Sequence, residues 1–72
     1  MKEYFIVKRI AGPYHFFSHA STVRKNEPPI IIWIDTIEGA YRHDSYSQAL
    51  ETIKAIAVEN EVYQIDKLFI KA

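Results

Sequence analysis

The hydrophobic pattern of the chain is dominated by one uninterrupted apolar run, Ile30 to Ile34. Its β-branched residues favour an extended strand, and the lack of alternation predicts that both faces of this strand are buried. Pro28 and Pro29 stand immediately before the run and argue against the alternative, a buried helix. We therefore expect the central strand of a sheet here, extending to about Thr36.

Two hydrophobic segments near the N-terminus predict a hairpin. Residues 3–10 carry apolar side chains at both alternating phases in their first half, which indicates a strand. Residues 11–13, Ala-Gly-Pro, are turn formers. The returning strand is predicted over residues 14–18, with continuation to about Val23 as the alternative.

The pattern after the central run predicts two further strands. A tight turn is expected at Glu38-Gly39, because glycine tolerates positive φ. Residues 40–43 then predict a short fourth strand paired back on the central one. Residues 62–70 predict the last strand, and their apolar positions change phase at Asp66-Lys67. A bulge or a turn would account for that change.

A single amphipathic helix is predicted between the last two strands. Ser45 is a natural N-cap, and Gln48 stands three residues later, as in a capping box. Asn60 is suited to end the helix in the left-handed conformation. Apolar residues recur on one side at helical spacing: Tyr46, Ala49, Leu50, Ile53, Ile56 and Ala57.

The predicted element order is β-β-β-β-α-β. It defines an α+β fold in which a mainly antiparallel sheet of four to five strands has one helix packed on one face. A chain of 72 residues forms a single domain, 1–72. One helix covers only part of such a sheet, so we expect the other face to be partly bare.

Composition adds a reason to expect association. Hydrophobic residues make up 49% of the chain and aromatic residues 14%, with five tyrosines among them. A domain this short buries only roughly 60% of the surface that its unfolded chain exposes. Some aromatic side chains should therefore reach the surface, where tyrosine suits an interface. The alternative is that the tyrosines line the rim of the core.

The charged residues balance to a formal net charge of +0 but are unevenly distributed. Residues 1–25 hold five basic residues against one acid, and the remainder holds eight acids against four basic residues. The balanced total argues against a strong global field for nucleic acid or anionic lipid. Most of the asymmetry is expected to be solvated surface.

The chain has no cysteine, which excludes disulfides, thiolate catalysis and cysteine-ligated zinc. No apolar run approaches the ~18 residues of a membrane helix, and the N-terminus has no signal-like segment. We therefore expect a soluble cytoplasmic protein that does not engage a membrane.

The histidines do not predict a metal site. His15 and His19 share a strand face but would stand ~13 Å apart on a straight strand, too far for one ion. His43 and Asp44 are neighbours that point apart on a strand. We expect structural or surface roles for them, and neither metal nor cofactor.

Catalysis is also not expected. Asp35, Glu38 and Asp44 are candidates to cluster near the turn after the central strand, with His43 close by. A catalytic pair needs a cleft that shifts its pKa values, and a small sheet with one helix rarely encloses one. Two glycines in the chain leave no Gly-rich phosphate loop. No enzyme activity and no small-molecule substrate are therefore predicted.

The remaining prediction is a non-enzymatic binding module that acts through protein–protein contact. Sheet edges can accept a partner strand or a second copy, so a homodimer is one form of this prediction. By analogy, small domains of this profile serve as inhibitors or adaptors, including those of phages and mobile elements. The candidate partner-binding residues are Arg9, Tyr14, Arg24, Lys25 and Arg42.

The alternative function is a sheet-based nucleic-acid-binding protein that uses the basic N-terminal hairpin. Aromatic residues there alternate with basic ones, a combination that can stack bases and hold phosphates. The zero net charge argues against it, because nucleic-acid domains usually carry an obvious basic footprint. The residues concerned are Tyr4, Phe5, Tyr14, Phe16, Phe17, Lys8, Arg9, Arg24 and Lys25.

Overall fold

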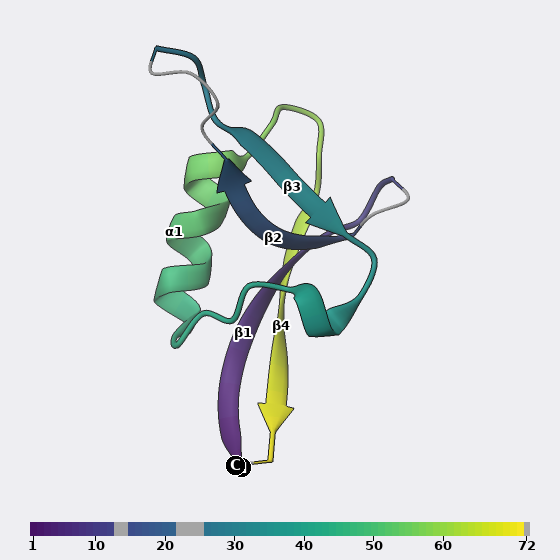
Figure 1. Cartoon of the computed structure of the whole chain (residues 1–72), viewed down its shortest axis with the longest axis vertical. Coiled ribbons are helices and arrows are strands. Elements are labelled where there is room, and N and C mark those ends of the chain that lie inside the picture. The colour runs from purple at the N-terminus through teal and green to yellow at the C-terminus, as the bar shows by residue number, and fades with distance from the viewer. Residues whose placement is uncertain (13–14, 22–25, 72) are drawn as a thin grey trace.

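A computed structural model describes residues 1–12, 15–21 and 26–71 of the chain (Figure 1). Four strands form one antiparallel sheet of order β3-β2-β1-β4, and one helix precedes the last strand. The predicted α+β class with a single helix is thereby confirmed, with four strands. The elements are β1 (Lys2–Arg9), β2 (Phe16–Ser21), β3 (Ile30–Ile34), the short 3₁₀ helix η1 (Ile37–Gly39), α1 (Tyr46–Ile56) and β4 (Tyr63–Ile70).

The long β1–β4 ribbon is the most regular part of the sheet. Its register runs without interruption from Lys2↔Ile70 to Arg9↔Tyr63, and both chain ends lie together at the bottom of Figure 1. The prediction of a bulge or a turn at Asp66-Lys67 is therefore wrong, because neither forms there. The apolar phase changes because β4 serves both faces of the sheet. Tyr63 and Ile65 pack against the core, whereas Leu68 and Ile70 point to the opposite face.

The position of β3 corrects the prediction of a central strand. β3 lies at one edge of the sheet, pairs only with β2, and ends at Ile34 rather than near Thr36. Its unbroken apolar run has another cause. Ile31 and Trp33 pack against the core, and the alternate isoleucines lie on the far face. The prediction that both faces of this strand are buried is also wrong, because no side chain from Ile30 to Ile34 is fully buried. An unbroken apolar run shows only that both faces of the strand carry apolar side chains.

The core lies between α1 and one face of the sheet. Val7 on β1 and Phe17 on β2 meet Ala49 and Ile56 on α1 in one cluster of buried side chains. Val7 and Ala49 are wholly inaccessible to solvent, because the small alanine lets the helix approach the sheet closely.

The predicted fourth strand over residues 40–43 does not form. η1 occupies the preceding turn, where Gly39 lies against Ile34 and leaves no room for a side chain. Positive φ occurs at Gly12 and not at Gly39. The segment then makes one isolated bridge, from His43 to Phe5 of β1, and does not pair with β3.

The helix begins as predicted. The Ser45 Oγ accepts the backbone N–H of Gln48 at 3.1 Å, and the Gln48 side chain accepts the backbone N–H of Asp44 at 3.0 Å. It ends earlier than predicted, at Ile56. Asn60 does adopt the left-handed conformation, with φ 71°, but in the loop that leads to β4.

Within the described ranges, no helix is long and apolar enough to cross a membrane.

The cap supports a stability prediction. Ser45→Ala removes the acceptor for the Gln48 N–H and should lower the free energy of unfolding by about 1 kcal/mol. Urea denaturation followed by circular dichroism measures the change. Ser47→Ala, inside the same first turn, is the matched control and should leave stability unchanged or slightly higher, since alanine is the better helix former. Equal losses in both variants would contradict the role of the cap.

Candidate functional site

The sheet is split between β1 and β2, and the segment 41–43 fills the gap. Among the described residues, the two strands pair at Lys8↔Phe16, and the Arg9 N–H next to this pair donates to the His15 carbonyl. Beyond this point the Tyr41 N–H donates to the Phe17 carbonyl of β2 at 2.9 Å. His43 exchanges two backbone hydrogen bonds with Phe5 of β1, each of 2.9 Å. The segment therefore joins two strands that no longer reach each other.

His43 fastens this segment to the helix as well. Its side chain is buried, with 2% exposed. Nδ1 lies 2.9 Å from the Phe5 carbonyl oxygen, and Nε2 lies 2.7 Å from the Thr52 Oγ1 on α1. A carbonyl only accepts, so Nδ1 carries the proton, and in the neutral ring Nε2 accepts from the Thr52 hydroxyl. Both ring nitrogens are thus satisfied within the fold.

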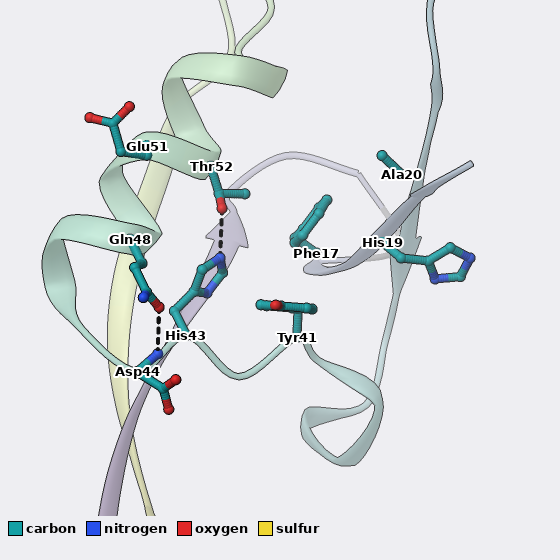
Figure 2. Close-up of a pocket in the computed structure, with 9 residues that line it drawn as sticks. All are labelled: Phe17, His19, Ala20, Tyr41, His43, Asp44, Gln48, Glu51 and Thr52. Carbon is teal, nitrogen blue, oxygen red and sulfur yellow. Dashed lines mark hydrogen bonds between the residues drawn. The ribbon is translucent and has the colours of Figure 1, made fainter. Parts of the chain in front are cut away.

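A cleft lies beside this segment, between α1 and β2 (Figure 2). Its volume is about 520 Å³. Tyr41 and His43 lie between the two elements, with ring centroids 4.8 Å apart in an edge-to-face arrangement, and Phe17 closes the strand side. The cleft is lined by Phe17, His19, Ala20, Tyr41, His43, Asp44, Gln48, Glu51 and Thr52.

The two carboxylates of the cleft lie near lysine ammonium groups. Figure 2 shows the carboxylates of Asp44 and Glu51 turned away from Tyr41 and His43. Asp44 lies 3.9 Å from the Lys2 ammonium, and Glu51 lies 3.6 Å from that of Lys54. Among the described residues, no three histidine or acidic side chains gather where they could hold a metal ion.

A second surface feature is the outer edge of β3, called here the β3 edge: the backbone of residues 30–34 on the side away from β2. The backbone carbonyls of His15 and Phe17 on β2 point to the side of β1. Phe16 lies between them, so its backbone N–H and C=O groups point the opposite way, toward Ile34 of β3. By alternation, Ile31 and Trp33 point their N–H and C=O groups outward. No partner for these groups lies among the described residues.

The side chains of β3 are all apolar, yet all of them remain accessible to solvent. Ile30 is 54% exposed, and the other four are only partly buried. No side chain of the longest apolar run in the chain is therefore fully removed from solvent.

The predicted binding residue Arg9 belongs to an aromatic cluster on the helix face of the sheet. Its guanidinium carbon lies 4.5 Å from the centre of the Trp33 ring, and its Nη1 lies 3.9 Å from Glu61. Trp33 in turn stacks on Tyr63 with ring centroids 6.0 Å apart. Arg9 therefore contributes to the packing of β1, β3 and β4 together.

Tyr63 holds the loop before β4 through its hydroxyl. It donates to the Glu61 carboxylate at 2.9 Å and accepts the Val58 N–H at 3.0 Å. Burial raises the pKa of the Tyr63 phenol above its ordinary 10.0. The Val58 hydrogen bond opposes this rise and the Glu61 carboxylate adds to it.

The other predicted binding residues do not form one group with Arg9. Arg42 is exposed, and its guanidinium carbon lies 5.7 Å from the centre of the Tyr4 ring, which Lys2 also approaches, at 5.0 Å. Tyr4 and Arg9 stand five positions apart on β1, roughly 17 Å along the strand. Tyr14, Arg24 and Lys25 lie outside the described residues.

The three histidines lie in separate places. His15 precedes β2 and its Nδ1 lies 3.1 Å from the Arg9 carbonyl oxygen, whereas the Nδ1 of His19 lies 3.0 Å from the Ser18 hydroxyl. His43 is the buried one. The cleft around His43 and the β3 edge were both missed as sites from the sequence. The Pro28-Pro29 pair before an apolar strand was the available signal for an edge.

Comparison with known protein families, with curated proteins and with solved structures finds no match to this chain.

The His43–Thr52 bond predicts a measurable loss of stability. Thr52→Val keeps the side-chain shape but leaves Nε2 of His43 without its donor, which should lower the free energy of unfolding by about 1 kcal/mol. Thr36→Val is the control, because Thr36 makes no side-chain bond at the start of η1. Urea denaturation measures both, and an unchanged midpoint for Thr52→Val would refute the bond.

The raised pKa of Tyr63 predicts a change at alkaline pH. The unfolded chain loses the phenolic proton first, so the stability contributed by the neutral phenol is complete below the unfolded pKa of 10.0 and is lost as the pH rises through the higher folded pKa. Tyr63→Phe should cost about 1 kcal/mol near neutral pH through its lost hydrogen bonds.

This cost should shrink above the unfolded pKa, because ionisation of the partly buried Tyr63 phenol destabilises only the wild type. Urea midpoints at neutral pH and above the unfolded pKa test this. Tyr46→Phe, at an exposed ring, provides the comparison. A constant difference between wild type and Tyr63→Phe across the pH range would contradict the assignment.

Proposed function

We propose that this protein is a small binding module that acts through protein–protein contact at the β3 edge. The observation that carries the proposal is the exposure of the β3 strand, whose apolar side chains are nowhere fully buried. Such an edge offers both unpaired backbone groups and apolar side chains, the two components of recognition by strand addition.

The energy available at this edge favours a partner. Complete burial of an isoleucine side chain contributes about 1.5–3 kcal/mol relative to an exposed one. Ile30 is half exposed and its neighbours on β3 are partly so, which leaves part of this energy unused in the single chain. The outward N–H and C=O groups of Ile31 and Trp33 would gain protein partners on strand addition.

The opposite edge of the sheet is less suited to this role. β4 carries Asp66 and Lys67 in its middle, and the Lys67 ammonium pairs with Glu3 at 3.2 Å. Charged side chains on an edge strand oppose pairing with another chain. β3 has no charged residue between Ile30 and Ile34.

A module of this kind would work by occupying a surface, as an inhibitor or an adaptor does. The chain's second candidate function, nucleic-acid binding by the N-terminal hairpin, has less support. Arg9 is already paired with Glu61 and covered by Trp33, so it is poorly placed for a phosphate. The Lys2–Tyr4–Arg42 group is the remaining observation in its favour.

Site-specific photo-crosslinking in cells that express the full chain tests the proposal. A benzophenone amino acid in place of Ile30 should form adducts that protease removes and nuclease does not. The same group in place of Glu59, exposed in the loop after α1, is the matched control and should form few.

Each result has a clear meaning. Protein adducts at position 30 above the control support contact at the β3 edge. Nuclease-sensitive adducts would favour the nucleic-acid function instead. Equal yields at the two positions would overturn the proposed role of the β3 edge.

A further inference from the structure

We infer that the occupant of the β3 edge is the β3 strand of a second copy, paired antiparallel about a two-fold axis at Ile32. This inference rests on the proposed function and specifies its partner. It would join the two four-stranded sheets into one continuous sheet of eight strands.

Backbone geometry selects this axis. The outward groups belong to Ile31 and Trp33, which stand symmetrically about Ile32. With the axis there, Ile31 of each copy faces Trp33 of the other, so two hydrogen-bonded pairs form. Pro29 marks the end of the pairing, because proline has no N–H to donate.

The charge pattern also favours a second copy. In this register Ile32 faces Ile32, Ile30 faces Ile34, and Ile31 faces Trp33, so every cross-strand pair is apolar. Pairs of β-branched and aromatic side chains are favourable across strands. An edge strand that pairs with its own copy must not place like charges opposite each other. β3 meets this requirement because it has no charged residue between Ile30 and Ile34.

The same test disfavours self-pairing about the middle of the other edge, β4. An axis at Asp66 or at Lys67 of β4 places like charges directly opposite each other. An axis at Leu68 places Lys67 against Phe69, and one at Ile65 places Lys67 against Tyr63. Each of these registers therefore places a charged residue opposite either a like charge or an aromatic side chain.

The faces of the two copies also match. A two-fold axis perpendicular to the sheet keeps both α1 helices on one side. On the other side, Ile30, Ile32 and Ile34 of each copy would form one continuous apolar patch. A five-residue strand buries less than the roughly 1,200–2,000 Å² of a stable interface, so we expect a dimer that dissociates on dilution.

The absence of native cysteine allows a direct test of the register. Ile32 would face Ile32 of the second copy at a non-hydrogen-bonded position. Cα atoms at such positions lie ~4.5 Å apart, a distance that a disulfide can bridge. Ile32→Cys should therefore form a disulfide-linked dimer under mild oxidation. Phe69→Cys, exposed on β4 at the opposite edge, is the matched control and should form at most about a tenth as much.

A second pair of variants tests the same register if Ile32→Cys fails to fold. An equimolar mixture of Ile30→Cys and Ile34→Cys should form the mixed disulfide in preference to either homodimer. Light scattering of the unmodified chain should show the mass rising from monomer toward dimer with concentration. Ile32→Lys should weaken the dimer by about tenfold or more, since it opposes two ammonium groups at the axis.

The outcomes separate this inference from the proposed function. A monomer at every concentration, with no preferred disulfide, would overturn the second copy as partner. The proposed function would survive if position 30 still crosslinked to a different protein. A dimer linked through Phe69→Cys and not Ile32→Cys would place self-association at β4 and overturn the inference.

Discussion

The fold depends on how the gap between β1 and β2 is closed. In the part of the chain that the structure describes, the two strands pair at Lys8↔Phe16, and beyond this pair Phe5 and Phe17 bond to the segment 41–43 instead of to each other's strand. The segment 41–43 satisfies both sides, and His43 continues the connection through its ring to Thr52 of α1. Strand, inserted segment and helix are thus held by one buried polar side chain, whose two nitrogens must both remain bonded because burial removes the alternative of water.

The sequence was sufficient for features that depend on neighbouring residues and insufficient for those that depend on distant ones. Ser45 and Gln48 predict the helix start because the cap is closed within four residues. The edge position of β3 could not be predicted, since strand order arises from pairings between distant segments. Similarly, nothing near residue 43 signals that its partners would be Phe5 and Thr52. Four of the five candidate binding residues are basic, and the structure gives one of them, Arg9, a packing role.

Charged and apolar residues are divided between the two edges of the sheet. β4 carries Asp66 and Lys67 in its middle, whereas β3 carries no charged residue. Charges therefore protect the β4 edge and leave the β3 edge open, which is why the proposed association is expected at β3. A chain this short has few side chains with which to cover both faces and both edges of its sheet. A strand that stays uncovered is then available for contact with a partner.

Trp33 is the chain's single tryptophan, and on β3 its ring lies near both the Arg9 guanidinium and the Tyr63 ring. Fluorescence excited at the long-wavelength end of the indole absorption, where the five tyrosines do not absorb, therefore originates from this strand alone. The protein carries a built-in optical probe at the very edge where docking is proposed, so events there are observable in the unlabelled molecule.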